Sequence, residues 1–156
     1  MGFWERLIGA GPAEEKDPRR LLPELLVSYR EECRLAQQIR EHANSAPHQS
    51  GTQKLRAIAE EQDRVVQLLR DKLVTLNGEM QDSIGPIKEG KNYWSRVGHD
   101  LEDSQALRQH YNEQAIYWEP DFPEIVALYR TLEYEKSRIN NLLRDVAIRA
   151  DPHALD

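Results

Sequence analysis

The chain has 156 residues, of which 39% are hydrophobic and 31% are charged, with only two Phe. This length fits one domain with a real core, and the composition favours narrow apolar stripes on long solvated helices over a β-rich or α/β enzyme core. The formal net charge of −6 excludes the broad basic surface that nucleic-acid binding needs. Cys33 is the single cysteine, so an internal disulfide is impossible.

The first 17 residues predict a short amphipathic segment followed by a linker that contains Gly and Pro. Phe3 and Trp4 make this segment a candidate for contact with the domain, a protein partner or a membrane surface. No stretch reaches the roughly 20 apolar residues that a membrane-spanning helix requires, and the start lacks a signal-peptide pattern. We therefore expect a cytoplasmic protein without a transmembrane segment.

Residues 18–150 predict four long helices, and residues 151–156 predict a tail. Asp17 and Pro18 are typical of a helix start, and apolar residues then recur at three- and four-residue steps. The expected helices span residues 18–44, 52–77, 91–118 and 123–150. Short connections within each pair and a longer connection between the pairs predict an all-α, antiparallel four-helix bundle.

The second helix of each pair carries a similar sequence. Residues 55–71 read LRAIAEEQDRVVQLLRD and residues 129–145 read YRTLEYEKSRINNLLRD, with seven identities in 17 positions and no gap. This similarity, at a spacing of 74 residues, predicts that the bundle consists of two pseudo-repeated helical hairpins.

Two polar residues share one repeat position on the stripes that should be apolar: Gln62 and Lys136. A buried ammonium group is costly unless it is paired with an acid. Four carboxylates at a matching depth are candidate partners of Lys136: Glu31, Glu32, Glu102 and Asp103. The alternative is that Lys136 lies at the flank of its stripe and extends to solvent.

With two helix pairs, acidic first helices and a second-helix phrase close to Glu-x-x-His-x-x-Leu-Leu, the chain resembles the ferritin-like superfamily, in particular small rubrerythrin-like bacterial bundles. In that family the motifs hold a di-iron or di-manganese site. On the register of the Leu-Leu pairs, the family's glutamates fall on Gln62 and Lys136, and its histidines fall on Val65 and Ile139. An ammonium group and aliphatic side chains cannot bind a metal, so the resemblance implies the fold with degenerate metal motifs.

Two functions stay open at this point. The first is a non-catalytic bundle without a cofactor, acting as a structural or protein-interaction module that forms a homo-oligomer or binds a protein partner. The alternative is a di-metal oxidoreductase or metal-binding protein that uses iron or manganese, with candidate ligands Glu32, Glu61, Glu102 and Glu135. Whether the chain is an enzyme is therefore left open.

Histidine and aromatic side chains give further candidates. His42 is expected near a helix C-terminus, where it favours the helix dipole. Trp94 and Trp118 lie on an aromatic-rich helix, and either core packing or a partner surface accounts for them. Together with Phe3 and Trp4, they are the predicted interaction residues.

Overall fold

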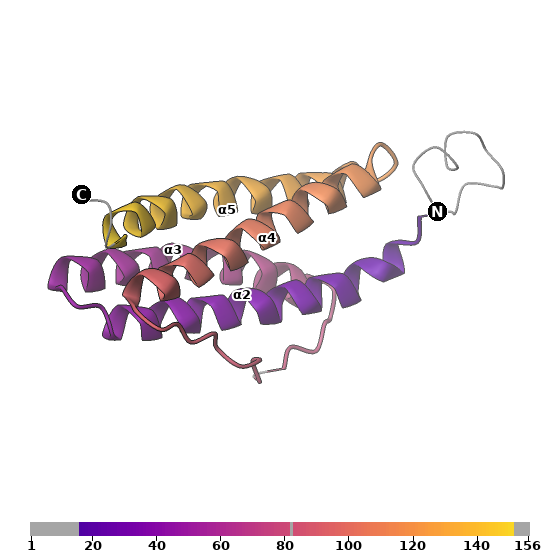
Figure 1. Ribbon diagram of the computed structural model, residues 1–156. Helices are drawn as coiled ribbons and strands as arrows, with labels where there is room; N and C mark the ends of the chain where they lie inside the picture. The colour runs from indigo at the N-terminus through magenta and orange to yellow at the C-terminus, as the bar shows by residue number, and fades with distance from the viewer. Residues whose placement is uncertain (1–15, 82, 152–156) are drawn as a thin grey trace.

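The computed structural model describes residues 16–81 and 83–151 (Figure 1). A single turn of 3-10 helix, η1 (Pro18–Arg20), leads into four long helices. These are α2 (Leu21–Asn44), α3 (Gln49–Thr75), α4 (Tyr93–Trp118) and α5 (Pro123–Ala150). The predicted all-α four-helix bundle is confirmed. Phe3, Trp4 and the tail from residue 152 onward lie outside the described residues.

Local sequence signals set the ends of the helices. The Asp17 side chain accepts a hydrogen bond from the backbone N–H of Arg19 at 3.0 Å, and Asn92 caps α4 by accepting from the Ser95 N–H at 2.8 Å. After α3, Asn77 adopts a left-handed conformation with φ of 55°, and the Gly78 N–H donates to the Leu73 carbonyl at 2.8 Å.

The predicted boundaries differ from the structure mainly at the start of α3. The segment that precedes residue 52 was expected to be a break between helices, but Gln49, Ser50 and Gly51 form the first turn of α3. The N–H groups of the first helical turn have no carbonyl partner within the helix and can bond to water. Polar residues and Gly51 are therefore tolerated in this turn. The structure begins α4 at Tyr93, two residues later than predicted, and α5 spans the predicted range.

The two helix pairs pack side by side around one core. Within the described residues, α2 packs on α3 and α4, and α5 also packs on α3 and α4. The core side chains come from all four helices, and Leu25, Leu35, Leu69, Tyr111 and Leu143 are each fully buried. This burial of apolar stripes supplies the main driving force for assembly of the bundle.

A long connection joins the two pairs by running the length of the bundle (Figure 1). Gly78, just after α3, lies against Leu22 at the start of α2, whereas the start of α4 lies at the other end, where Arg96 contacts Ser45. Residues 76–92, which we call the crossover, therefore return the chain to the end at which α2 finishes. As a result, α2 and α4 are antiparallel neighbours. No helix in the described part of the chain is long and apolar enough to cross a membrane.

Candidate functional site

A buried polar cluster lies where the helix pairs meet. The Lys136 side chain on α5 is 0% exposed, and its Nζ atom donates to Glu32 Oε2 on α2 at 3.1 Å and to Gln62 Oε1 on α3 at 2.8 Å. Glu32 and Gln62 are also 0% exposed. The ammonium group therefore does not extend to solvent, and its charge is balanced inside the core by the Glu32 carboxylate.

The amide of Gln62 links the two charged groups. Its Nε2 atom donates to the Glu32 side chain and, at 3.0 Å, to the Glu32 backbone carbonyl, while its Oε1 atom accepts from Lys136. The reverse orientation of the amide would place oxygen against a carboxylate and nitrogen against an ammonium group. A glutamine at this position therefore satisfies both neighbours, because an amide is both a donor and an acceptor.

Tyr111 on α4 completes the cluster. Its hydroxyl donates to Glu32 Oε1 at 2.9 Å, and its side chain is 0% exposed. The sequence placed Tyr111 on the core stripe without assigning it a partner, although a buried tyrosine hydroxyl normally requires one. Glu32, Gln62, Tyr111 and Lys136, which we call the central cluster, thus come from four different helices.

Burial and charge act on the protonation of this cluster. Burial lowers the pKa of Lys136, and the charge and hydrogen bond of Glu32 oppose that change. Burial, followed by the negative charge of Glu32, raises the pKa of Tyr111 well above its ordinary value of 10.0. The Tyr111 hydroxyl therefore stays protonated at neutral pH and remains a donor to Glu32.

A second polar network joins α2, α4 and the crossover. Gln38 Nε2 donates to Asp100 Oδ1 at 2.9 Å and to Asp103 Oδ2 at 3.1 Å, and Gln38 Oε1 accepts from the Lys88 N–H at 2.9 Å. Arg34 Nη2 donates to Asp103 Oδ2 at 3.2 Å, and Lys88 Nζ also donates to Asp103. With His42, these residues form what we call the crossover network.

His42 lies within this network between two oxygen partners. Its Nδ1 atom is 2.8 Å from Asp100 Oδ1, and its Nε2 atom is 3.0 Å from the Lys88 carbonyl oxygen. A carbonyl oxygen can only accept, so Nε2 carries a proton, and a further proton lies between Nδ1 and the Asp100 carboxyl group. His42 therefore holds the crossover against α4, in addition to lying in the last turn of α2 as expected.

The two carboxyl groups of the crossover network have pKa values that shift in opposite directions. Burial raises the pKa of Asp100, and hydrogen bonding and charge from His42 offset only part of that increase. Burial also raises the pKa of Asp103, but hydrogen bonds from Lys88 and Gln38 and the charge of Arg34 outweigh it, so the net pKa is lowered.

Of the four carboxylates considered as partners of Lys136, Glu32 contacts it and the other three lie elsewhere. Glu31 is partly exposed and pairs with Arg34 at 3.0 Å, and Glu102 is 74% exposed near His99. Asp103 belongs to the crossover network. Glu31 and Glu32 are adjacent on α2, so a rotation of about 100° between them turns one side chain toward the core and the other toward solvent.

The alternative metal ligands are not brought together. Glu61 and Glu135 are partly buried at the edge between α3 and α5, where Arg64 and Arg138 pair with them, whereas Glu32 is in the core and Glu102 is on the surface. Among the described residues, no group of three or more His, Cys, Asp or Glu side chains is placed to hold a metal ion.

The predicted interaction residues divide between surface and core. Trp94 is 46% exposed and remains available to a partner. Trp118 is 1% exposed, and its ring packs edge-on against Tyr117 and Phe122 at the end of α4. This burial corrects the assignment of Trp118 as an interaction residue: it is a core residue that fills the end of the bundle.

Sequence reasoning missed the crossover network. Arg34, Gln38 and His42 follow one another at four-residue steps on α2, and this polar stripe was the available signal. Lys88, the partner of Gln38 and His42, lies in the crossover, where no periodicity indicates which helix it will contact.

Comparisons with known proteins bear on the arrangement of the helices. No family model matches the chain, and no curated protein matches its sequence. Among solved structures, the chain is similar to the bacterioferritin-related protein from Bacteroides fragilis, described as a dodecameric thioferritin, with a TM-score of 0.72. The chain has the ferritin-like fold. The similarity covers 85% of this chain and 87% of that chain at 16% sequence identity, so it concerns the fold alone.

Within this ferritin-like bundle, α2 and α3 form the first helix pair and α4 and α5 form the second. The central cluster takes one residue from each of these four helices. The expected ferritin-like fold is thus confirmed.

Proposed function

We propose that this chain is a non-catalytic ferritin-like bundle without a complete di-metal site, which acts as a structural or protein-interaction module. One observation carries the proposal: the buried Lys136 ammonium group contacts Glu32 at a position where the family resemblance implies a metal-binding glutamate. A fixed positive charge at that position balances the Glu32 carboxylate, as a bound cation would.

The donor set of the central cluster supports this proposal because it does not fit a pair of metal ions. Glu32 is its only carboxylate, the Gln62 amide is a weak ligand, and the Lys136 ammonium group has no lone pair and repels cations. Val65 and Ile139, at the positions implied for histidine, are buried aliphatic side chains that cannot bind a metal.

Hydrogen bonding within the central cluster also supports a structural role for these residues. The Glu32 carboxylate accepts from Lys136, Gln62 and Tyr111, and each of these side chains is 0% exposed. A buried hydrogen-bonded network of this kind rigidifies the core and specifies how the helices fit together. The hydrogen bonds of the network then favour a single register of the four helices.

Self-association is the second half of the proposal. The structurally similar protein from Bacteroides fragilis is described as dodecameric, and this chain exposes large apolar side chains on all four helices. Examples more than half exposed are Val27, Val74, Ile116, Tyr134 and Ile148. We propose that a homo-oligomer covers part of this apolar surface.

Metal analysis tests the absence of a di-metal site. The full chain is produced with iron and manganese supplied, and its metal content is measured by inductively coupled plasma mass spectrometry. We expect far less than one transition-metal ion per chain. One or two iron or manganese ions per chain that are lost in a Glu61→Gln/Glu135→Gln variant, but retained in a Glu60→Gln control, would overturn the proposal.

Sedimentation equilibrium tests self-association. The chain has a mass of 18.1 kDa, and we expect the full chain to sediment as a closed assembly of several copies. A mass equal to a single chain at every concentration would contradict the oligomer and leave binding to a different protein as the structural function.

A further inference from the structure

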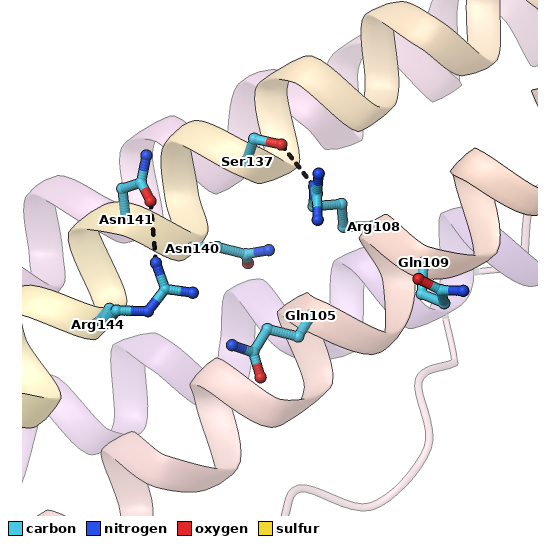
Figure 2. A pocket seen from close by; sticks show the side chains of 7 residues that line it. All are labelled: Gln105, Arg108, Gln109, Ser137, Asn140, Asn141 and Arg144. Carbon is cyan, nitrogen blue, oxygen red and sulfur yellow. Dashed lines mark hydrogen bonds between the residues drawn. The ribbon is translucent and has the colours of Figure 1, made fainter.

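A polar groove lies on the outside of the bundle between α4 and α5 (Figure 2). Its volume is about 480 Å³, which is within the range of small-molecule sites, roughly 300–1,000 Å³. All seven side chains that line it are polar, with three from α4 and four from α5. Such a lining differs from the largely apolar lining of most small-molecule pockets, so the groove favours a polar ligand.

Two guanidinium groups give the groove a positive charge. Arg108 and Arg144 line it, and its lining includes no carboxylate, although the whole chain carries a net charge of −6. Arg144 Nη1 donates to Asn141 Oδ1 at 3.2 Å, and within the described residues no carboxylate forms a salt bridge with it. Arg108 donates to Ser137 Oγ at 2.7 Å and is 3.9 Å from Glu133, which bonds Arg130 more closely at 2.7 Å.

The floor of the groove contains a buried amide with an unpartnered oxygen. Asn140 is 4% exposed, and its Oδ1 atom has no hydrogen-bond partner in the described part of the chain. Figure 2 shows the Asn140 amide extending from α5 into the space between the helices. Reversing the amide would leave its nitrogen without a partner instead, so a polar atom remains to be satisfied in either orientation.

A second unpartnered oxygen lies at the same level. Ser104 on α4 is 0% exposed, and its Oγ atom has no partner among the described residues. The Arg108–Ser137 hydrogen bond sets the register of these antiparallel helices, so Ser104, one turn before Arg108, lies opposite Asn140, about one turn after Ser137. Ser104 does not itself line the groove, so the Asn140 amide is the unpartnered buried group that a ligand in the groove can reach.

These groups together define the chemistry of a ligand. Guanidinium groups bind phosphate oxygens with charge-assisted hydrogen bonds, and amide side chains can donate to and accept from hydroxyl groups. The lining offers no aromatic ring or aliphatic side chain on which a nucleotide base could stack. We propose that the groove between α4 and α5 is a binding site for a sugar phosphate, with the arginines on the phosphate and the amides on the hydroxyl groups.

Isothermal titration calorimetry of the full chain tests this site with three probes: glucose 6-phosphate, inorganic phosphate and glucose. We expect glucose 6-phosphate to bind once per chain and at least about tenfold more tightly than either fragment, since both halves of the groove then contribute. Equal affinity for inorganic phosphate would overturn the sugar-phosphate assignment, because the groove would then be a simple anion site. Absence of binding by glucose 6-phosphate would overturn the site itself.

Matched variants locate the binding. Arg144→Gln removes one positive charge from the groove, and Arg138→Gln removes one from the same helix outside it. We expect Arg144→Gln to weaken binding of glucose 6-phosphate by about tenfold or more, and Arg138→Gln by less than about twofold. Asn140→Asp, which keeps the side-chain shape and adds a negative charge, is expected to abolish binding while thermal unfolding shows that the variant folds.

Three outcomes would contradict the location. Equal weakening by Arg144→Gln and Arg138→Gln would show a general charge effect. Unchanged binding in folded Asn140→Asp would show that the ligand lies elsewhere. A change in the mass of the assembly in Arg144→Gln, without a change in binding of glucose 6-phosphate, would show that the groove is an interface between copies of the chain.

Discussion

At the scale of single residues, Glu32 has the largest number of partners in the central cluster. Its carboxylate accepts from Lys136, Gln62 and Tyr111 in a region closed to water. Each donor lost from such a carboxylate leaves an acceptor that water cannot reach. The stability of the core therefore depends on individual hydrogen bonds to this one side chain.

Tyr111→Phe tests this dependence with a change of a single hydroxyl group. We predict a loss of about 1–3 kcal/mol in the free energy of unfolding, because the ring still fills its space while Glu32 Oε1 loses its donor. Urea unfolding measures the loss, with Tyr134→Phe as the control, since Tyr134 is 64% exposed. Equal stability of Tyr111→Phe and the unchanged protein would show that the hydrogen bond contributes nothing.

Asp103 gives the protein a pH dependence of defined sign. Since its folded pKa lies below the ordinary value of 3.8, its carboxylate stabilises the fold above pH 3.8, and this contribution is lost as the pH falls through the folded pKa. We predict that Asp103→Asn is less stable than the unchanged protein at pH 7 and that the difference shrinks as the pH falls below 3.8.

Unfolding free energies measured from pH 2.5 to 7 check this prediction. Glu102→Gln is the control, because Glu102 lies on the same helix and is 74% exposed, so the variant should differ little at any pH. A constant difference between Asp103→Asn and the unchanged protein over the whole range would exclude Asp103 as the source of the pH dependence.

At the scale of elements, the crossover is attached to α2 through the backbone of Lys88 and to α4 through the Lys88 side chain. The Lys88 N–H donates to Gln38 and the Lys88 carbonyl accepts from His42, so both backbone groups of one residue are tied to α2. This fixes the middle of a long connection whose described residues form no helix.

Gln38→Met tests that attachment while keeping the size of the side chain. We predict faster hydrogen exchange of the Lys88 amide, because its acceptor is removed, with little change for amides in the middle of α3 and α5. Gln37→Met is the control, since Gln37 bonds only its surface neighbour Glu41 among the described residues. Unchanged exchange at Lys88 in Gln38→Met would show that another contact holds the crossover.

The helices and most of their ends could be predicted from the sequence because both signals are local. Apolar steps of three and four residues indicated which faces are buried, and Asp17 and Pro18 marked the start of the first helix. The repeat spacing also placed Gln62 and Lys136 at equivalent positions of the two repeats. In the structure, Lys136 Nζ lies 2.8 Å from Gln62 Oε1. Local signals therefore predicted the helices, and the internal repeat predicted that Gln62 and Lys136 occupy matching positions.

The partners of these residues could not be predicted because they depend on the register between helices far apart in sequence. Periodicity does not decide whether Glu31 or Glu32 faces the core when both lie near the edge of a stripe. Tyr111 meets Glu32 across 79 positions of the chain, and Lys88 meets Gln38 across 50. Packing of the whole bundle fixes these contacts.

At the scale of the whole molecule, the ferritin-like fold is combined with an unusual interior. The four helices and the long crossover match the fold, but the central cluster contains one carboxylate, one amide, one hydroxyl and one ammonium group. Lys136 is the counter-charge of Glu32, and under the function proposed above this fixed charge serves the architecture of the bundle.

A double-mutant cycle at Lys136 and Glu32, measured by urea unfolding from pH 5 to 8, tests this account most directly. We predict that Lys136→Met loses about 3–5 kcal/mol, because Glu32 is left as an unpaired buried charge, and that adding Glu32→Gln restores most of the loss. Arg138→Met, on the same helix and partly exposed, controls for the loss of a positive charge. Stability of Lys136→Met equal to or above that of the unchanged protein over this pH range would contradict the pairing.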